Sequence, residues 1–169
     1  LGDAAHAIVP FYGQGMNASF EDVVVFDEVL EKFEDKLFAG ELDWKKIFQE
    51  YEKVRKKDTD AIADLAVDNF HEMKEHTASE LFQQKRKLET AFEAEFPDKY
   101  YSKYSMVTFN ENVSYNEAMT RGRAQDKAIL NLIDDGELHE TMPLNEKLIL
   151  VKSTTEEILD DNAVLGKLK

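Results

Sequence analysis

Apolar residues recur at intervals of three and four positions along most of this chain, a spacing that places side chains on one face of an α-helix. The first such run follows Ala18, and Gly40 is its expected end. The positions that share its stripe are Phe20, Val23, Val24, Asp27, Leu30 and Phe33. Glu21 and Asp22 lie near the amino end, where negative charge is favourable. The pattern predicts a long amphipathic helix.

A second helix is expected to start at Asp43, because a carboxylate suits the amino-terminal cap. One of its faces carries Trp44, Ile47, Phe48, Tyr51 and Val54. The charged run 53–60 indicates a solvated face, and Asp58-Thr59 is a point at which the helix can restart or bend. A further stripe then comprises Ile62, Leu65, Ala66, Asn69, Phe70 and Met73.

The rest of the chain predicts more helices and one extended segment. A helix is expected over residues 79–95, and Pro97 ends it. Residues 105–109 are rich in β-branched and aromatic types, which favour an extended strand. The sequence 114–117 fits a capping box that opens another helix, and Gly136 lies at its expected end.

The tail gives a weaker pattern. Residues 148–151 are all apolar and predict either a short strand or a buried helical turn. Residues 154–157 start a weak final helix. Taken together, these elements predict a mainly α fold.

Glycines are concentrated in the first seventeen residues. Gly2-Asp3 follows an apolar residue, and the sequence 13–15, Gly-Gln-Gly, leads directly into the first helical run. Glycine lacks a Cβ, so it allows unusual dihedral angles and the close approach of a flat ligand. A helix amino terminus adds unpaired N–H groups and the positive end of the helix dipole. These residues predict a site for an anion, or for a ring that becomes anionic.

This arrangement resembles the second FAD-binding signature of the class A flavoprotein aromatic hydroxylases. The family pattern is Gly-Asp-Ala-Ala-His, then Pro, then Gly-x-Gly-x-Asn, and then an acidic residue within a helix. Here its pieces stand at residues 2–6, Pro10, 13–17 and Asp22. The alternative, an ordinary strand, turn and helix, explains the order of these pieces less well.

The resemblance implies the carboxy-terminal helical part of an α/β hydroxylase fold, which combines an FAD/NAD(P)-binding domain with a substrate domain. Residues 1–40 would end the FAD-binding domain. Residues 41–136 would form a helical domain with substrate-pocket residues, and residues 137–169 a tail of uncertain structure.

The same resemblance assigns roles within the signature. Asp3 would bind a ribityl or ribose-side hydroxyl of FAD, and Pro10 would lie beside the isoalloxazine. The helix start at Met16-Asn17 would face flavin N1 and C2=O, while His6 would pack or hydrogen-bond the backbone. The implied FAD-binding residues are Gly2, Asp3, Pro10, Gly13, Gln14, Gly15, Met16 and Asn17.

Two further stretches, 68–73 and 103–109, resemble the members of this family that hydroxylate L-kynurenine. The resemblance implies that Asn69 and Tyr104 bind the amino-acid carboxylate, and that Arg and Tyr ligands come from another part of the protein. It extends from Leu1 to about residue 132. The implied substrate-binding residues are Phe11, Tyr12, Asn69, Met73, Tyr104 and Thr108. The second residue of the Phe11-Tyr12 pair varies within the family, which leaves its contact open.

The implied reaction uses FAD, NADPH and O₂ to hydroxylate an aromatic ring, and it needs no catalytic side chain from this chain. No Gly-x-Gly-x-x-Gly motif occurs in the sequence, although such enzymes need one for the FAD pyrophosphate. We therefore expect an amino-terminal half as partner, without which this part is inactive, and a possible homodimer. The resemblance implies the cytosolic side of the mitochondrial outer membrane in a eukaryote, or the cytoplasm in a bacterium.

Composition excludes several other classes of protein. The 35 acidic and 21 basic residues give a formal charge of −14, which argues against binding to nucleic acid or to anionic lipid. The chain has no cysteine, and no apolar run approaches the ~18 residues of a membrane span. His71 and His76 are five residues apart, whereas a helical zinc pair needs four, so we expect no metal site.

Alternatives remain open at this point. Asn69 could be a satisfied core amide that ties two helices together, and an isolated tyrosine such as Tyr104 is more often a core or rim residue than a ligand contact. A different aromatic hydroxylase, acting on a phenol-like substrate, fits the same FAD signature. A non-catalytic helical interaction module is the third reading, and the glycine pattern speaks against it.

Overall fold

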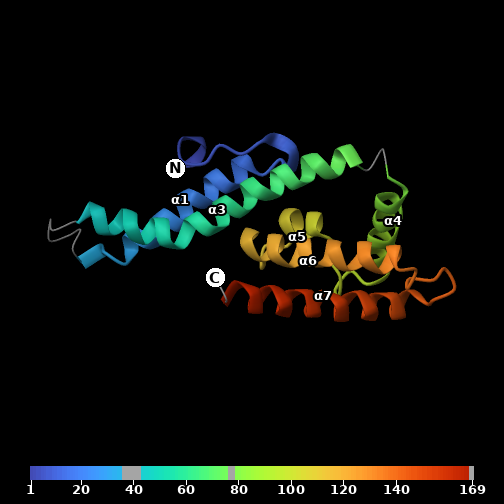
Figure 1. The fold of residues 1–169 in the computed structure, drawn as a ribbon. Coiled ribbons are helices and arrows are strands. Elements are labelled where there is room, and N and C mark those ends of the chain that lie inside the picture. The colour runs from blue at the N-terminus through green and yellow to red at the C-terminus, as the bar shows by residue number, and fades with distance from the viewer. Residues whose placement is uncertain (36–42, 76–78, 168–169) are drawn as a thin grey trace. The chain divides into compact units, whose positions relative to one another are not determined.

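The computed structural model describes residues 1–35, 43–75 and 79–167. Most of these residues are helical and none is in a β-strand, which confirms the mainly α fold class (Figure 1). The elements are η1 (Gly2–Ala4), η2 (Pro10–Tyr12), α1 (Gly15–Glu31), α3 (Trp44–Glu75), α4 (Glu80–Glu95), α5 (Lys103–Phe109), α6 (Tyr115–Asp134) and α7 (Leu144–Lys167). The helix end expected at Gly40 lies outside the described residues. The chain divides into two compact units, Leu1–Phe70 and His71–Lys169.

In the first unit, α1 and α3 pack against each other in opposite directions. The Phe26 ring lies edge-on to the Tyr51 ring, with centroids 5.5 Å apart, and Asp22 pairs with Arg55. The predicted cap at Asp43 is confirmed, because its Oδ1 accepts a hydrogen bond from a backbone N–H in the first turn of α3 at 3.3 Å. The buried apolar residues of this unit include Ala18, Val29, Ile47, Ala61, Ile62, Leu65 and Ala66.

The buried face of α1 differs from the apolar stripe that the sequence predicted. Phe20, Val23 and Val24 are exposed, whereas the Asp22 side chain is completely buried. The prediction was wrong because it ranked positions by hydrophobicity alone. The face of α1 that contacts α3 carries Asp22, and Arg55 of α3 neutralises the charge of that carboxylate.

α3 continues as one helix through Asp58-Thr59, so the expected interruption does not occur. The Thr59 hydroxyl donates to the carbonyl of Lys56 at 3.0 Å, which satisfies the side chain without breaking the helix. The surrounding run 53–60 is not wholly solvated either, because Arg55 and Thr59 are buried.

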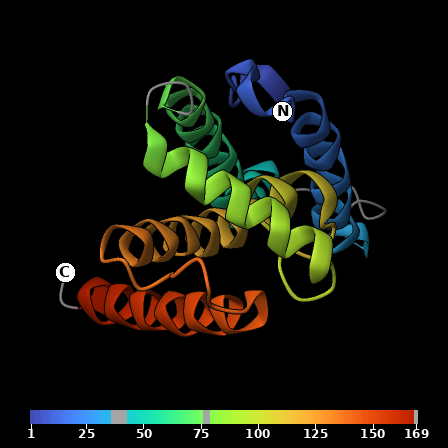
Figure 2. The ribbon, with the colours of Figure 1, turned by 90° about the vertical axis from the view of Figure 1, so that its right-hand side faces the viewer.

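In the second unit, α6 packs against α4, α5 and α7, and α6 and α7 lie side by side along their lengths (Figure 2). The capping residue predicted for α6 is confirmed, since Ser114 Oγ accepts the N–H of Glu117 at 3.3 Å. Gly136 follows the helix with φ +71, the left-handed conformation expected of a terminating glycine. The core cluster consists of Phe92, Tyr100, Ile129, Leu132, Leu148 and Val151.

Residues 105–109 are helical and not extended, because they belong to α5. Ser102 caps this helix, and its Oγ accepts a backbone N–H from the first turn at 3.2 Å. Lys103, Met106 and Val107 are buried at helical spacing. This burial outweighs the β-propensity of the local sequence, which depends strongly on context.

The tail contains one long helix, α7, which begins at Leu144 and not near Thr154 as predicted. Of the two readings of residues 148–151, the buried helical turn is confirmed. Leu148 and Val151 enter the core cluster, while Ile149 is exposed.

Candidate functional site

The glycine turn at the start of the chain is held against α1 by one carboxylate. Asp22 Oδ2 accepts the backbone N–H of Gly2 at 2.7 Å and lies 2.6 Å from Nε2 of His6. Gly2 has φ +59, a conformation that side chains other than glycine rarely adopt. The expectation that His6 would pack or bond the backbone is confirmed, because its side chain is only 13% exposed and its backbone N–H donates to the carbonyl of Gly2 at 3.0 Å; the bond of its ring to Asp22 was not predicted.

Arg55 of α3 completes this cluster from the other side. Its Nε lies 2.7 Å from Asp22 Oδ1, and a terminal nitrogen donates to the carbonyl of Ala18 at 2.9 Å. Burial alone would raise the pKa of Asp22, but hydrogen bonds from Arg55, Gly2 and His6 outweigh it and hold that pKa below 3.8. The carboxylate thus stays ionised and fixes the turn, α1 and α3 together.

The second glycine turn leaves the amino end of α1 open. Gly13 has φ +68, and a Cβ added at Gly13 or Gly15 would meet no atom within 4 Å. α1 begins at Gly15, and the next residue, Met16, is 68% exposed. Asp3, in the first turn, is exposed as well. The described part of the chain therefore leaves room beside this helix end, where its first N–H groups have no acceptor within the helix.

Asn69 connects α3 to the short helix η2. Its Nδ2 donates to the carbonyl oxygen of Phe11 at 2.7 Å, and the Phe11 and Phe70 rings pack with centroids 4.7 Å apart. An amide carries two N–H donors and one acceptor, and this contact uses one donor. Phe11 is 37% exposed, whereas Tyr12 is buried.

The other predicted substrate residues belong to the second unit. Tyr104 is 40% exposed and lies on the same face of α5 as Thr108, one turn further along. The Thr108 hydroxyl is buried and has no hydrogen-bond partner among the described residues. Met73, in the last turn of α3, is exposed. That these three residues and Asn69 act on one substrate stays a prediction.

A network of charged side chains lies beneath α5. Lys103 pairs with Glu72 and with Asp126, whose Oδ2 is 2.6 Å from its Nζ. Lys85 pairs with the other oxygen of Asp126 at 2.7 Å and with Glu89 at 3.2 Å. Burial raises the pKa of Glu89 to about 7, although Lys85 acts against the shift. Burial would lower the pKa of Lys103, but the neighbouring carboxylates outweigh it and raise that pKa above 10.5.

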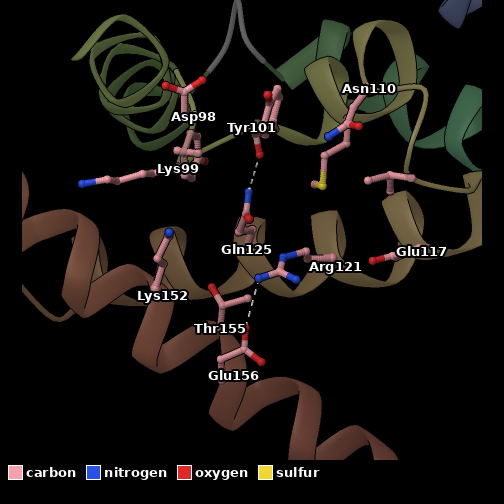
Figure 3. Close-up of a pocket in the computed structure, with 13 residues that line it drawn as sticks. Asp98, Lys99, Tyr101, Asn110, Glu117, Arg121, Gln125, Lys152, Thr155 and Glu156 are labelled. Carbon is pink, nitrogen blue, oxygen red and sulfur yellow. Dashed lines mark hydrogen bonds and ion pairs between the residues drawn. The ribbon is translucent and has the colours of Figure 1, made fainter. Parts of the chain in front are cut away.

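A separate pocket of about 180 Å³ opens between the 98–101 loop, α6 and α7 (Figure 3). Gln125 donates to the carbonyl of Tyr101 at 2.9 Å on one side, and Arg121 pairs with Glu156 at 3.2 Å on the other. None of the residues that the sequence predicted for FAD or substrate lines this pocket.

Two classes of feature are not found in the part of the chain that the structure describes. No group of three or more His, Cys, Asp or Glu side chains is arranged to hold a metal ion. No described helix combines the length and the apolar character needed to cross a membrane.

Three residues around these sites gave no usable signal in the sequence. Arg55 lies 33 positions from Asp22, within a charged run that indicated solvent. Lys103 lies just before residues 105–109, which were read as extended, and Gly122 interrupts no pattern within α6. Only the packing of separate helices reveals their contacts.

The chain matches known proteins over most of its length, although no family model matches it. It is 45% identical to the kynurenine 3-monooxygenase of Flavobacterium johnsoniae over 152 residues, which are 88% of this chain and 32% of that protein. It is 43% identical to that of Dictyostelium discoideum, over 79% of this chain and 30% of the relative. It is 42% identical to that of Sus scrofa, over 76% of this chain and 26% of the relative.

The chain thus spans about a third of the length of the relatives that it matches. The similarity covers both compact units, and the relatives come from bacteria, an amoeba and a mammal. The resemblance drawn from the glycine signature and from the stretches around Asn69 and Tyr104 is confirmed: this chain is similar to one part of the kynurenine 3-monooxygenases of these organisms.

Proposed function

We propose that this chain is the flavin-facing and substrate-binding part of an enzyme that hydroxylates L-kynurenine to 3-hydroxykynurenine with FAD, NADPH and O₂. The observation that carries the proposal is the pair of glycine turns beside α1. In the first turn, Asp22 accepts a hydrogen bond from the backbone N–H of Gly2. The second turn leaves open space beside the start of α1. The relatives named kynurenine 3-monooxygenase support the choice of substrate.

The residues present suit FAD. The open space beside Gly13 and Gly15 admits a flat ring close to the backbone, and the exposed carboxylate of Asp3 can accept a hydrogen bond from a ribityl or ribose hydroxyl. FAD, when bound and reduced by NADPH, would supply the redox chemistry with O₂. The chain would contribute position and electrostatics, because the N–H groups at the start of α1 favour negative charge next to Met16.

The substrate residues would contribute hydrogen-bond donors and apolar walls. We assign Asn69 and Tyr104 to the amino-acid carboxylate, because an amide N–H and a phenol O–H are suitable fixed donors. Phe11 and Met73 are exposed apolar side chains suited to an aromatic ring. Tyr12 is the weakest member of the set, since its side chain is buried.

A further part of the protein would complete the enzyme. The exposed stripe of Phe20, Val23 and Val24 on α1 supports a partner surface, because contiguous exposed apolar side chains often mark an interface. The partner would be the amino-terminal half, which holds the FAD pyrophosphate. A homodimer and a place at the mitochondrial outer membrane, or in a bacterial cytoplasm, belong to the same proposal.

The test is substrate-dependent NADPH oxidation by the full-length protein, with FAD absorbance recorded on the same sample. Acceleration by L-kynurenine, with formation of 3-hydroxykynurenine, is expected. Acceleration by phenols alone would assign a different aromatic hydroxylase. A colourless protein that takes up no FAD would contradict the proposal and favour a helical interaction module.

A further inference from the structure

Lys103 is a buried cation at the first position of α5. Only 5% of its surface is exposed, and its ammonium group reaches both Glu72 and Asp126. A buried charge is tolerated when it is paired and hydrogen-bonded, and removing one partner is then strongly unfavourable. The Asp126 carboxylate is itself shared with Lys85, so it cannot turn toward another group without breaking that pair.

Gly122 of α6 makes room for the aliphatic stem of Lys103. A Cβ added at Gly122 would lie 2.5 Å from Cγ, 2.7 Å from Cβ and 2.9 Å from Cδ of Lys103. Glycine is less favourable than alanine inside a helix, so its presence in the middle of α6 needs a reason. The close passage of the Lys103 stem over the backbone of α6 supplies that reason.

These contacts determine where α5 lies on α6. The helix has seven residues, Lys103–Phe109, and so short a helix depends on tertiary contacts for its position. Its buried face is formed by Lys103, Met106 and Val107. Tyr104 and Thr108 lie on a different face, so a rotation or shift of α5 would displace both of them together.

We propose that Gly122 and the Lys103–Asp126 ion pair are positioning elements, which hold α5 so that Tyr104 and Thr108 meet the substrate. This inference rests on the proposed function, because it assumes that those two residues bind kynurenine. Lys103, Gly122 and Asp126 would not touch the substrate. They would act only through the placement of α5.

The test is a double-mutant cycle in the full-length enzyme. Gly122→Ala introduces the clash with the Lys103 stem, and it should raise the KM for kynurenine about tenfold or more, since small misplacements in a site are costly. FAD content and the slow NADPH oxidation without substrate should stay at the wild-type level. Lys103→Gly removes all three clashing atoms, so adding Gly122→Ala to it should have no further effect on KM.

Arg121→Met is the matched control, because Arg121 precedes Gly122 on α6 and its pair with Glu156 is exposed. If Gly122→Ala fails to fold, Asp126→Asn tests the contact of Lys103 with α6 without adding volume, and it should also raise the KM for kynurenine. An unchanged KM in the folded variant, or the same effect of Gly122→Ala with and without Lys103, overturns the inference. If kynurenine does not accelerate NADPH oxidation by the wild-type enzyme, the proposed function is refuted instead, so the two failures are distinguishable.

Discussion

The guanidinium Nε of Arg55 lies 2.7 Å from Oδ1 of Asp22, and both side chains are almost completely buried. Asp22 belongs to the glycine signature near the start of the chain, whereas Arg55 belongs to α3. The pair therefore joins the turn at Gly2 to a helix far along the sequence. Because Asp22 also accepts the backbone N–H of Gly2 at 2.7 Å, the same carboxylate fixes that turn.

Removing Arg55 should destabilise the protein more than the loss of a surface ion pair would. Arg55→Met leaves a buried carboxylate without its main partner, which costs about 3–5 kcal/mol. Arg121→Met, which breaks an exposed pair, should cost about 1 kcal/mol or less. Urea unfolding of the two full-length variants measures the difference in the free energy of unfolding. Equal midpoints would show that the buried pair stabilises the protein no more than the exposed pair does.

Glu89 should make stability depend on pH near neutrality. Burial raises its pKa to about 7 from an ordinary 4.5, so the folded state binds this proton more tightly than the unfolded state. Its contribution is therefore complete below about pH 4.5 and is lost as the pH rises toward 7. Lys85 at 3.2 Å and Asp126 beyond it are the charges closest to this carboxyl in the ion-pair network.

Glu89→Gln keeps a neutral side chain at every pH, so its melting temperature should fall less than that of the wild type between about pH 5 and 8. Glu80→Gln, an exposed substitution on the same helix α4, should follow the wild-type curve. Thermal unfolding at several pH values checks both. Parallel curves for all three proteins would mean that Glu89 does not titrate in this range.

Asn69 should matter more for substrate binding than for FAD binding. Asn69→Ala removes an N–H donor, which corresponds to about 1 kcal/mol or more and hence to a several-fold increase in KM for kynurenine. Because the amide also holds the Phe11 carbonyl at 2.7 Å, some of that increase would come from movement of η2. Kinetics at saturating NADPH, with Asn131→Ala on α6 as the exposed control, separate this effect from general damage. A wild-type KM would remove Asn69 from the site.

Local signals in the sequence predicted much of the fold. Caps at Asp43 and Ser114, the stop at Pro97 and the terminating Gly136 all act within one helical turn, and the structure confirms them. The extended reading of 105–109 failed because helical burial of a short segment is decided by its neighbours in space. For the same reason, charge alone did not reveal that Arg55 is buried.

The candidate site likewise contains residues that the sequence revealed and residues that it did not. The signature around Gly2 and Gly13 was visible because the backbone at both residues has a positive φ, a conformation that favours glycine. Arg55, which holds the Gly2 turn through Asp22, and Lys103, which holds α5, are ordinary cations in the sequence. Arg55 lies in the charged run 53–60, and Lys103 lies among aromatic and hydroxyl residues. Their partners lie far away in the sequence, at Asp22 and Asp126, and no spacing rule connects them.

The most direct test of the account is the FAD dissociation constant of the full-length protein, compared between the wild type and Asp3→Ala. Loss of a charge-assisted hydrogen bond corresponds to about 1.5–3 kcal/mol, so we predict that Asp3→Ala weakens FAD binding by about tenfold or more. The fold should persist, because the Asp3 side chain is exposed. Equal FAD affinity in the two proteins would contradict the claim that this turn faces the flavin.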